Sequence, residues 1–143
     1  MQETELPSRS KMILVIEDSP TQALTLRSLL IHAGLKVICA TNGNDGVRLA
    51  GQVNPGLILL DIQMPDINGF EVCDQLKNDP ETANIPIIMF TQNDTPESLQ
   101  EGMRRGAVDY IPKDAFAPAV LLETLRQMGF IKSTKDLLSH DED

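Results

Sequence analysis

The sequence has no tryptophan, one tyrosine and four phenylalanines among its 143 residues. With so few aromatic rings, the hydrophobic core must be aliphatic, and the chain offers no aromatic platform on which bases could stack. Basic residues are also in the minority, because 12 lysines and arginines stand against 21 aspartates and glutamates, for a formal net charge of −9. The phosphates of nucleic acids and of anionic membranes would repel such an acidic chain, so neither is expected as a partner.

Cysteines and long apolar runs are scarce as well. Cys39 and Cys73 are far apart and form no CxxC motif, which excludes a disulfide scaffold and a cysteine zinc site, and we expect two buried, unreactive thiols. No apolar run approaches the roughly 18 residues of a membrane span. The N-terminus also lacks the basic start and apolar stretch of a signal peptide, so we expect a cytoplasmic protein.

The length of 143 residues corresponds to a single domain. We expect residues 11–130 to fold, with a flexible segment at 1–10 and an acidic tail at 131–143. Short runs rich in isoleucine, valine and leucine predict strands buried on both faces, as in parallel sheets. These runs are Met12–Ile16, Val37–Ala40, Leu57–Leu60, Ile85–Phe90 and Ala107–Ile111.

Segments with helical spacing lie between and after these runs. Their predicted starts carry capping residues or an early proline, at Ser19-Pro20, Asn42, Asn68 with Glu71, Thr95-Pro96 and Ala117-Pro118. Strands that alternate with helices in this way predict an α/β domain. Its sheet would be parallel, with helices on both faces and right-handed connections.

Polar residues follow four of the expected strands: Glu17 and Asp18, then Asp61, Thr91 and Lys113. Ligands of open parallel sheets bind at the carboxyl ends of the strands, so we expect one site there. Taken alone, each residue has a simpler interpretation, such as a helix cap for Asp18, a turn residue for Thr91 or a solvated charge for Lys113. Together they favour a metal and phosphate site, because clustered carboxylates need a counter-ion. Oxygen ligands without a nearby histidine favour Mg²⁺ over zinc or iron.

These residues lie in motifs that resemble the receiver domain of bacterial two-component response regulators. The resemblance runs from about Lys11 to Met128. It is carried by Ile-Glu-Asp-Ser-Pro at 16–20, Leu-Asp-Ile-Gln-Met-Pro-Asp-Ile-Asn-Gly at 60–69, Phe-Thr at 90–91 and Asp-Tyr-Ile-Pro-Lys at 109–113. It implies a flavodoxin-like, doubly wound (βα)5 domain with five parallel strands in the order 2-1-3-4-5.

The resemblance also implies a metal site and a phosphoacceptor. Asp61 would take a phosphoryl group from a phosphohistidine. Mg²⁺, or Mn²⁺ as a substitute, would be bound by Asp18, Asp61 and the backbone carbonyl of Gln63, with Glu17 acting through water. Thr91 would donate to one phosphoryl oxygen and Lys113 would pair with another.

Further roles follow from the same resemblance. Thr91 and Tyr110 would form a switch pair, in which Tyr110 turns inward after phosphorylation and the surface of the fourth helix, fifth strand and fifth helix changes. Gln63 and Asn93 occupy the positions that tune hydrolysis of the acyl phosphate. Asp66 is expected to be a loop or capping residue.

Two positions depart from the family pattern. The family usually has proline after its lysine, often with a cis bond, whereas Lys113 is followed by Asp114. The geometry of that bond is therefore open, and Asp114 is a potential ion-pair partner of Lys113. Gln92 stands where a small residue is common and would narrow access to the phosphate.

The sequence thus favours a stand-alone phosphoacceptor regulator that is not an enzyme beyond Mg²⁺-dependent phosphorylation and dephosphorylation of its own Asp61. Its expected partners are a histidine kinase or histidine phosphotransfer protein and an output protein, and it would be a monomer or a homodimer through the last helix. The alternatives are a phosphorelay intermediate and a receiver-like binding module that is never phosphorylated. A phosphatase of the haloacid-dehalogenase type is disfavoured, because Asp61-Ile62-Gln63 lacks its Asp-x-Asp motif.

Overall fold

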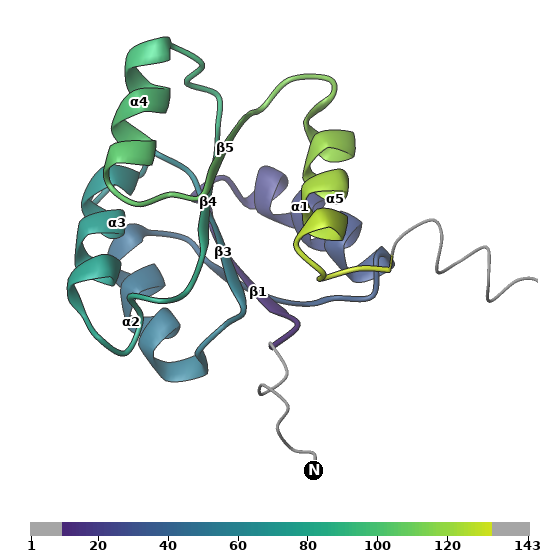
Figure 1. Cartoon of the computed structure of the whole chain (residues 1–143), viewed down its shortest axis with the longest axis horizontal. Coiled ribbons are helices and arrows are strands. Elements are labelled where there is room, and N and C mark those ends of the chain that lie inside the picture. Colours follow the sequence, from purple (N-terminus) through teal and green to yellow (C-terminus); the bar gives the residue numbers. More distant parts are fainter. Residues whose placement is uncertain (1–9, 133–143) are drawn as a thin grey trace, which may run out of the picture.

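The structure, a computed structural model, describes residues 10–132. Strands and helices alternate along the chain (Figure 1). The strands are β1 (Met12–Ile16), β2 (Lys36–Ala40), β3 (Leu57–Leu60), β4 (Ile87–Thr91) and β5 (Asp109–Pro112). The helices are α1 (Pro20–His32), α2 (Gly43–Val53), α3 (Gly69–Asn78), α4 (Pro96–Arg104) and α5 (Ala117–Gln127). Most of the N-terminal segment and acidic tail predicted at 1–10 and 131–143 lies outside the described residues.

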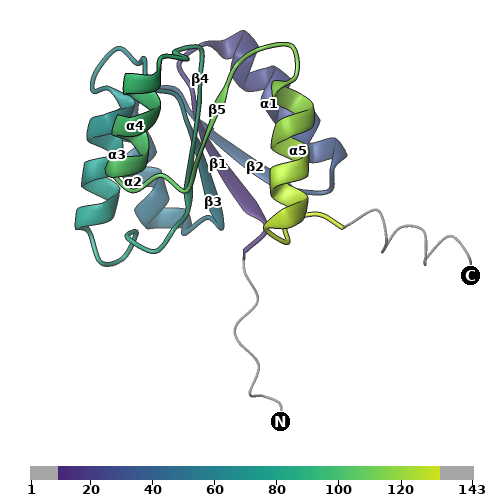
Figure 2. The same cartoon turned by 45° about the horizontal axis from the view of Figure 1, so that its top comes forward.

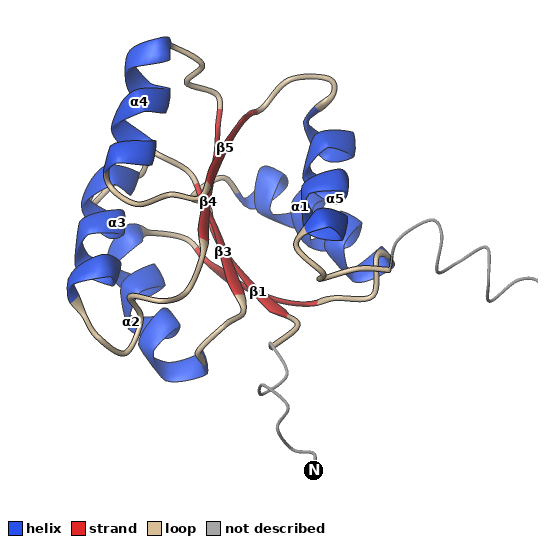
Figure 3. Cartoon of the chain, in the orientation of Figure 1, coloured by secondary structure: helices blue, strands red, loops and turns tan. Residues whose placement is uncertain are grey.

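The strands form one parallel sheet in the order β2-β1-β3-β4-β5, as predicted. Helices α2, α3 and α4 cover one face of the sheet, and α1 and α5 cover the other (Figure 3). The turned view in Figure 2 shows the same two groups of helices on either side of the strands. The flavodoxin-like α/β fold is therefore confirmed.

Each strand contributes to both faces of the sheet, because successive side chains point in opposite directions. In β3, Ile58 and Leu60 pack in the core under α2 and α3, whereas Leu57 and Leu59 pack in the core under α1 and α5. All four are fully buried or nearly so. This two-sided burial explains why the strands read as continuous apolar runs.

The predicted helix starts are confirmed for four helices. Their capping side chains accept a hydrogen bond from a backbone N–H three residues on, namely Ser19 from Gln22, Asn42 from Asp45, Asn68 from Glu71 and Thr95 from Ser98. Helix α5 begins differently, since Phe116 makes no side-chain cap. Just before it, Asp114 Oδ1 accepts from the Phe116 N–H at 2.9 Å.

Two strand boundaries and one cysteine were predicted wrongly. Ile85 donates to Thr82 within a turn, and Pro86, which has no N–H, precedes β4. Ala107 donates to Gly102 at the end of α4, so β5 begins only at Asp109. Both apolar residues are buried, but outside the sheet. Of the two free thiols, Cys73 is buried as expected and Cys39 is only half-buried.

Within residues 10–132, none of the helices has the length and apolar character required to span a bilayer.

Candidate functional site

Three carboxylates meet at the carboxyl ends of two neighbouring strands. β1 pairs with β3, with Ile16 opposite Leu60, so the residues that follow these strands emerge side by side. The chain stays paired at this point, because Asp61 N–H donates to the Ile16 carbonyl at 3.1 Å. Glu17, Asp18 and Asp61 each present a carboxylate oxygen within 4.8 Å of the others, as the sequence predicted.

This donor set fits a hard divalent cation. Carboxylate oxygens are the side-chain ligands that Mg²⁺ prefers, and a site with few protein ligands leaves positions for water and a phosphate oxygen. Glu17 and Asp61 are buried while Asp18 is exposed, so the cluster opens to solvent on one side. The backbone of Gln63 adjoins it, since its N–H donates to Asp61 Oδ1 at 3.3 Å.

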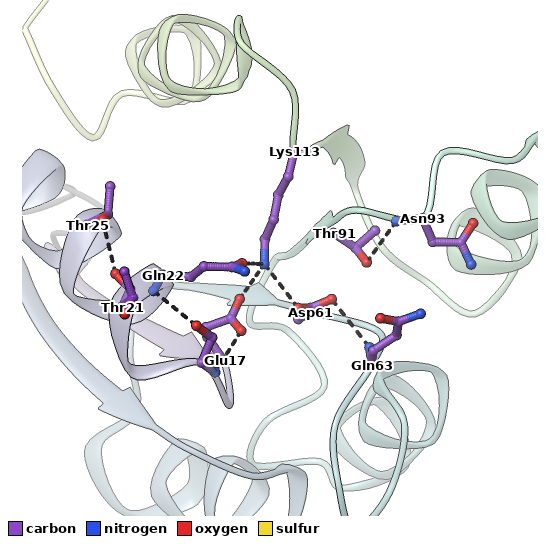
Figure 4. A network of polar contacts seen from close by, with 10 residues as sticks. Glu17, Thr21, Gln22, Thr25, Asp61, Gln63, Thr91, Asn93 and Lys113 are labelled. Carbon is purple, nitrogen blue, oxygen red and sulfur yellow. Dashed lines mark hydrogen bonds and ion pairs between the residues drawn. The ribbon is translucent and has the colours of Figure 1, made fainter.

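Lys113 enters the cluster from the end of β5. Its Nζ donates to carboxylate oxygens of Glu17 and Asp61, the latter at 3.0 Å, and to the side-chain oxygen of Gln22 (Figure 4). The lysine side chain is only 11% exposed. The ammonium is thus a counter-ion of two buried carboxylates.

Asp114, the potential ion-pair partner of Lys113, does not pair with it in this structure. Asp114 accepts from the Phe116 backbone, while Lys113 points into the acidic cluster. All peptide bonds within residues 10–132, including the one between these two residues, are trans. Gln22 was missed by the sequence reasoning, although its position in the first turn of α1, close after Glu17 and Asp18, could have indicated it.

Opposing effects act on the acidity of Glu17. Burial disfavours its charged form and raises the pKa of this carboxyl group. The Lys113 ammonium and the Ser19 backbone N–H, which donates to Glu17 Oε2 at 3.0 Å, act in the opposite direction without cancelling the effect of burial.

Thr91, Asn93 and Tyr110 are linked beside the cluster. Thr91 ends β4 and is fully buried, and its Oγ1 accepts from the Asn93 N–H at 3.4 Å. Tyr110 lies on β5 opposite Met89 and is also buried. Its hydroxyl donates to the Asn93 carbonyl at 2.6 Å, so the ring has the inward position in this structure. Burial raises the pKa of the Tyr110 phenol.

The loop between β3 and α3 carries Gln63 and is tied to α2. Both oxygens of Asp66 accept backbone hydrogen bonds at the start of α2, from Gly43 at 2.9 Å and Asn44 at 2.8 Å. These bonds lower the pKa of Asp66 to about 2. Asp66 is therefore a capping residue, as predicted, but it caps a helix more than 20 residues earlier in the chain.

A pocket of about 310 Å³ lies beside the cluster, between α1 and α5. Gln22 and Lys113 line it, and so does Gln92, the residue expected to narrow access to the site. In Figure 4, Thr91, Asn93 and Gln63 lie on the opposite side of Asp61 from Gln22. The expected site residues thus surround one aspartate.

Comparisons with known proteins agree with this geometry. A family model described as "Response regulator receiver domain" matches residues 13–126. The chain is 45% identical over 101 residues to Protein PilH of Pseudomonas aeruginosa, and the match covers 71% of this chain and 84% of PilH. It is 34% identical over 131 residues to a probable cyclic di-GMP phosphodiesterase of Vibrio cholerae, and this match covers 92% of this chain but only 29% of that protein. Several relatives are much longer than this sequence, which matches 42% or less of their length.

Solved structures show the same likeness. The Vibrio cholerae chemotaxis protein CheY4 matches with a TM-score of 0.76 at 29% identity, over 84% of this chain and 98% of that chain. The receiver domain of sensor histidine kinase PA1611 from Pseudomonas aeruginosa matches with a TM-score of 0.75 at 25% identity, over 82% of this chain and 96% of that chain. That domain was crystallised with a magnesium ion in its active site cleft.

Proposed function

The chain belongs to the response regulator receiver domain family, and from this premise we propose that its Asp61 accepts a phosphoryl group from a histidine kinase or a histidine phosphotransfer protein. Receiver domains act in two-component signal transduction. The observation that carries the proposal is the arrangement of Asp61 itself, with two further carboxylates within 4.8 Å and a lysine ammonium at 3.0 Å.

In the proposed reaction, an Asp61 carboxylate oxygen attacks the phosphorus atom of a phosphohistidine. The new oxygen–phosphorus bond forms as the phosphorus–nitrogen bond to the imidazole breaks, and the imidazole nitrogen keeps the electron pair. Catalysis of this kind depends on positioning and charge neutralisation more than on covalent participation by other groups. Asp61 is suited to it because its carboxylate is held at the edge of the pocket by the Lys113 ammonium and the Gln63 N–H.

The surrounding residues have distinct proposed tasks. Glu17, Asp18, Asp61 and the Gln63 carbonyl would hold Mg²⁺, or Mn²⁺ in its place, and the ion would neutralise charge on the phosphoryl oxygens. Lys113 would pair with one phosphoryl oxygen, and the Thr91 hydroxyl would donate to another. The carboxylates supply the hard oxygen ligands that this role requires.

Signalling would pass through Thr91, Asn93 and Tyr110. A Thr91 hydroxyl drawn toward the phosphoryl group moves the loop whose Asn93 carbonyl holds the Tyr110 hydroxyl, since these groups are already connected by hydrogen bonds. We infer a two-state equilibrium that the phosphoryl group biases. Exposed apolar side chains near this loop, Leu99 and Met103 on α4, would serve the output protein. Gln63 and Asn93 would set how readily water reaches the acyl phosphate.

Intact mass measurement tests the proposal. Incubated with Mg²⁺ and acetyl phosphate, the wild type should gain the mass of one phosphoryl group, and Asp61→Asn should gain none. Asp94→Asn is the matched control, because it removes an exposed carboxylate near the same edge of the domain and should be labelled normally. A wild type that stays unlabelled at millimolar Mg²⁺ would support the alternative of an unphosphorylated binding module. Transfer of the label to a histidine phosphotransfer protein would indicate a relay intermediate.

A further inference from the structure

The Lys113 ammonium has three oxygen partners, and one of them is unlike the others. Glu17 and Asp61 are charged and belong to the cluster that fits a divalent cation. Gln22 is a neutral amide from the first turn of α1, and its side-chain oxygen accepts from Lys113 Nζ at 2.5 Å. Its backbone N–H donates to Ser19 Oγ at 3.3 Å, so the helix cap fixes the residue's position.

A divalent cation and the ammonium compete for the same oxygens. The two positive charges would lie a few ångströms apart and repel each other, and the near-complete burial of the Lys113 side chain reduces screening of this repulsion by solvent. Lys113 must therefore give up Glu17, and part of its contact with Asp61, when a cation binds. The ammonium then needs another acceptor, because an unpaired charge that is nearly buried is costly.

Gln22 can supply that acceptor. In Figure 4 its amide approaches the ammonium from the side opposite Asp61. Of the polar side chains that line this pocket, Gln22 is the one that accepts from Lys113, whereas Thr25 donates to the Thr21 carbonyl and Asp114 accepts from Phe116. Much of the remaining lining is apolar, including Leu26, Leu29 and Phe90.

We propose that Gln22 is a positioning residue that keeps the Lys113 ammonium beside Asp61 when the carboxylates bind a divalent cation. It thereby strengthens cation binding and holds the lysine where a phosphoryl oxygen on Asp61 would arrive. This inference rests on the proposed function, because it assigns Gln22 a task within the same site.

The size of the effect on Mg²⁺ affinity follows from the hydrogen-bond acceptors that Lys113 keeps in the metal-free and in the metal-bound protein. Without the Gln22 amide, two carboxylates still hold the ammonium in the metal-free protein, so little is lost there. In the metal-bound protein Lys113 loses a hydrogen bond that the carboxylates no longer replace. Gln22→Ala should therefore weaken Mg²⁺ binding by about tenfold, which corresponds to about 1.4 kcal/mol.

A double-mutant cycle tests this. Mg²⁺ affinity is measured by calorimetric titration for the wild type, Gln22→Ala, Lys113→Met and the double variant, and unfolding curves check that each folds. Removing the ammonium should by itself tighten Mg²⁺ binding, and in that background Gln22→Ala should change the affinity less than about twofold. Gln22→Met keeps the bulk without the acceptor and should behave like Gln22→Ala. Thr25→Ala, one turn on and lining the same pocket, should bind Mg²⁺ like the wild type.

The possible results separate the positioning role of Gln22 from the proposed phosphotransfer. The proposal is wrong if Gln22→Ala leaves the affinity unchanged, or weakens it equally with and without the Lys113 amine, as a purely structural glutamine would. If the wild type does not bind Mg²⁺ even at tens of millimolar, the metal site and this inference fail together. If the cycle behaves as expected but Asp61 takes up no phosphoryl group, the positioning role stands and the proposed phosphotransfer fails.

Discussion

Two helical glycines should respond in opposite directions to replacement by alanine. Gly51 is exposed in α2, and a Cβ built there meets no atom within 4 Å. Gly69 is the first residue of α3, and a Cβ there would lie 2.4 Å from the Asp61 carbonyl oxygen and 2.8 Å from Ile62 Cα. Both of those atoms belong to the backbone, so a rotamer change cannot relieve the contact.

The expected free energies of unfolding follow from this difference. Gly51→Ala removes the entropic cost of glycine in a helix and should stabilise the protein by about 0.8 kcal/mol. Gly69→Ala gains little helix propensity at the first helical position, and it forces the backbone apart, which costs about 1–3 kcal/mol. At roughly 4 °C per kcal/mol for a domain of this size, the two melting temperatures should differ by about 7–15 °C.

Phosphorylation provides a second measurement. Gly69 N–H donates to the Ile62 carbonyl at 2.7 Å, so a shift at Gly69 passes directly to the chain after Asp61. A displacement of the reacting carboxylate by about 1 Å can slow a reaction about a hundredfold. Gly69→Ala should therefore lose labelling by acetyl phosphate well below its melting temperature, while Gly51→Ala keeps the wild-type rate. Equal stability and equal labelling of the two variants would refute the close approach of these backbone segments.

Four further measurements test individual groups. Ultraviolet titration of Tyr110, the chain's one tyrosine, should give a pKa above 10.0, and stability should fall as pH rises from this unfolded-state value through the higher pKa of the folded protein. Tyr110→Phe should cost about 1 kcal/mol, because the Asn93 carbonyl loses its donor. Cys73 should resist alkylation in the native protein near about pH 8, since burial raises its pKa to about 11, and Cys39 should react first. Asp66 has a pKa of about 2 against 3.8 in the unfolded chain, so its stabilising contribution is complete above pH 3.8 and lost toward pH 2, and Asp66→Asn should flatten the stability curve there.

The elements that could be predicted from the sequence are those fixed by local chemistry. A capping side chain reaches a backbone N–H only three residues away, so Ser19 and Thr95 marked the starts of α1 and α4 correctly. Strands buried on both faces leave an apolar signature of their own, which located β1 and β3 to the residue. Parallel pairing of these two strands then brings Asp61 beside Glu17 and Asp18.

What could not be predicted depends on contacts across the fold. Apolar composition does not distinguish a strand residue from a buried residue just before the strand, which is why Ile85 and Ala107 were misassigned. The cap that Asp66 provides to α2 joins segments 23 residues apart, and no local pattern reports it. The direction of a long side chain such as Lys113 is set by the groups around it. The sequence therefore could not show which three oxygens its ammonium contacts, or that Gln22 supplies one of them.

The site's own charge balance explains how the domain can keep two buried carboxylates and a third nearby. Their mutual repulsion disfavours the folded state unless positive charge is near, and Lys113 supplies one such charge from β5. The same ammonium opposes the entry of a doubly charged ion, so cation affinity depends on how easily Lys113 can move aside. The Gln22 amide on α1 accepts from the lysine without adding charge and so favours cation binding. A further carboxylate at that position would bind the lysine more tightly and would increase the repulsion among the carboxylates. A neutral acceptor at position 22 therefore suits a site that must bind a divalent cation and still keep the lysine beside Asp61.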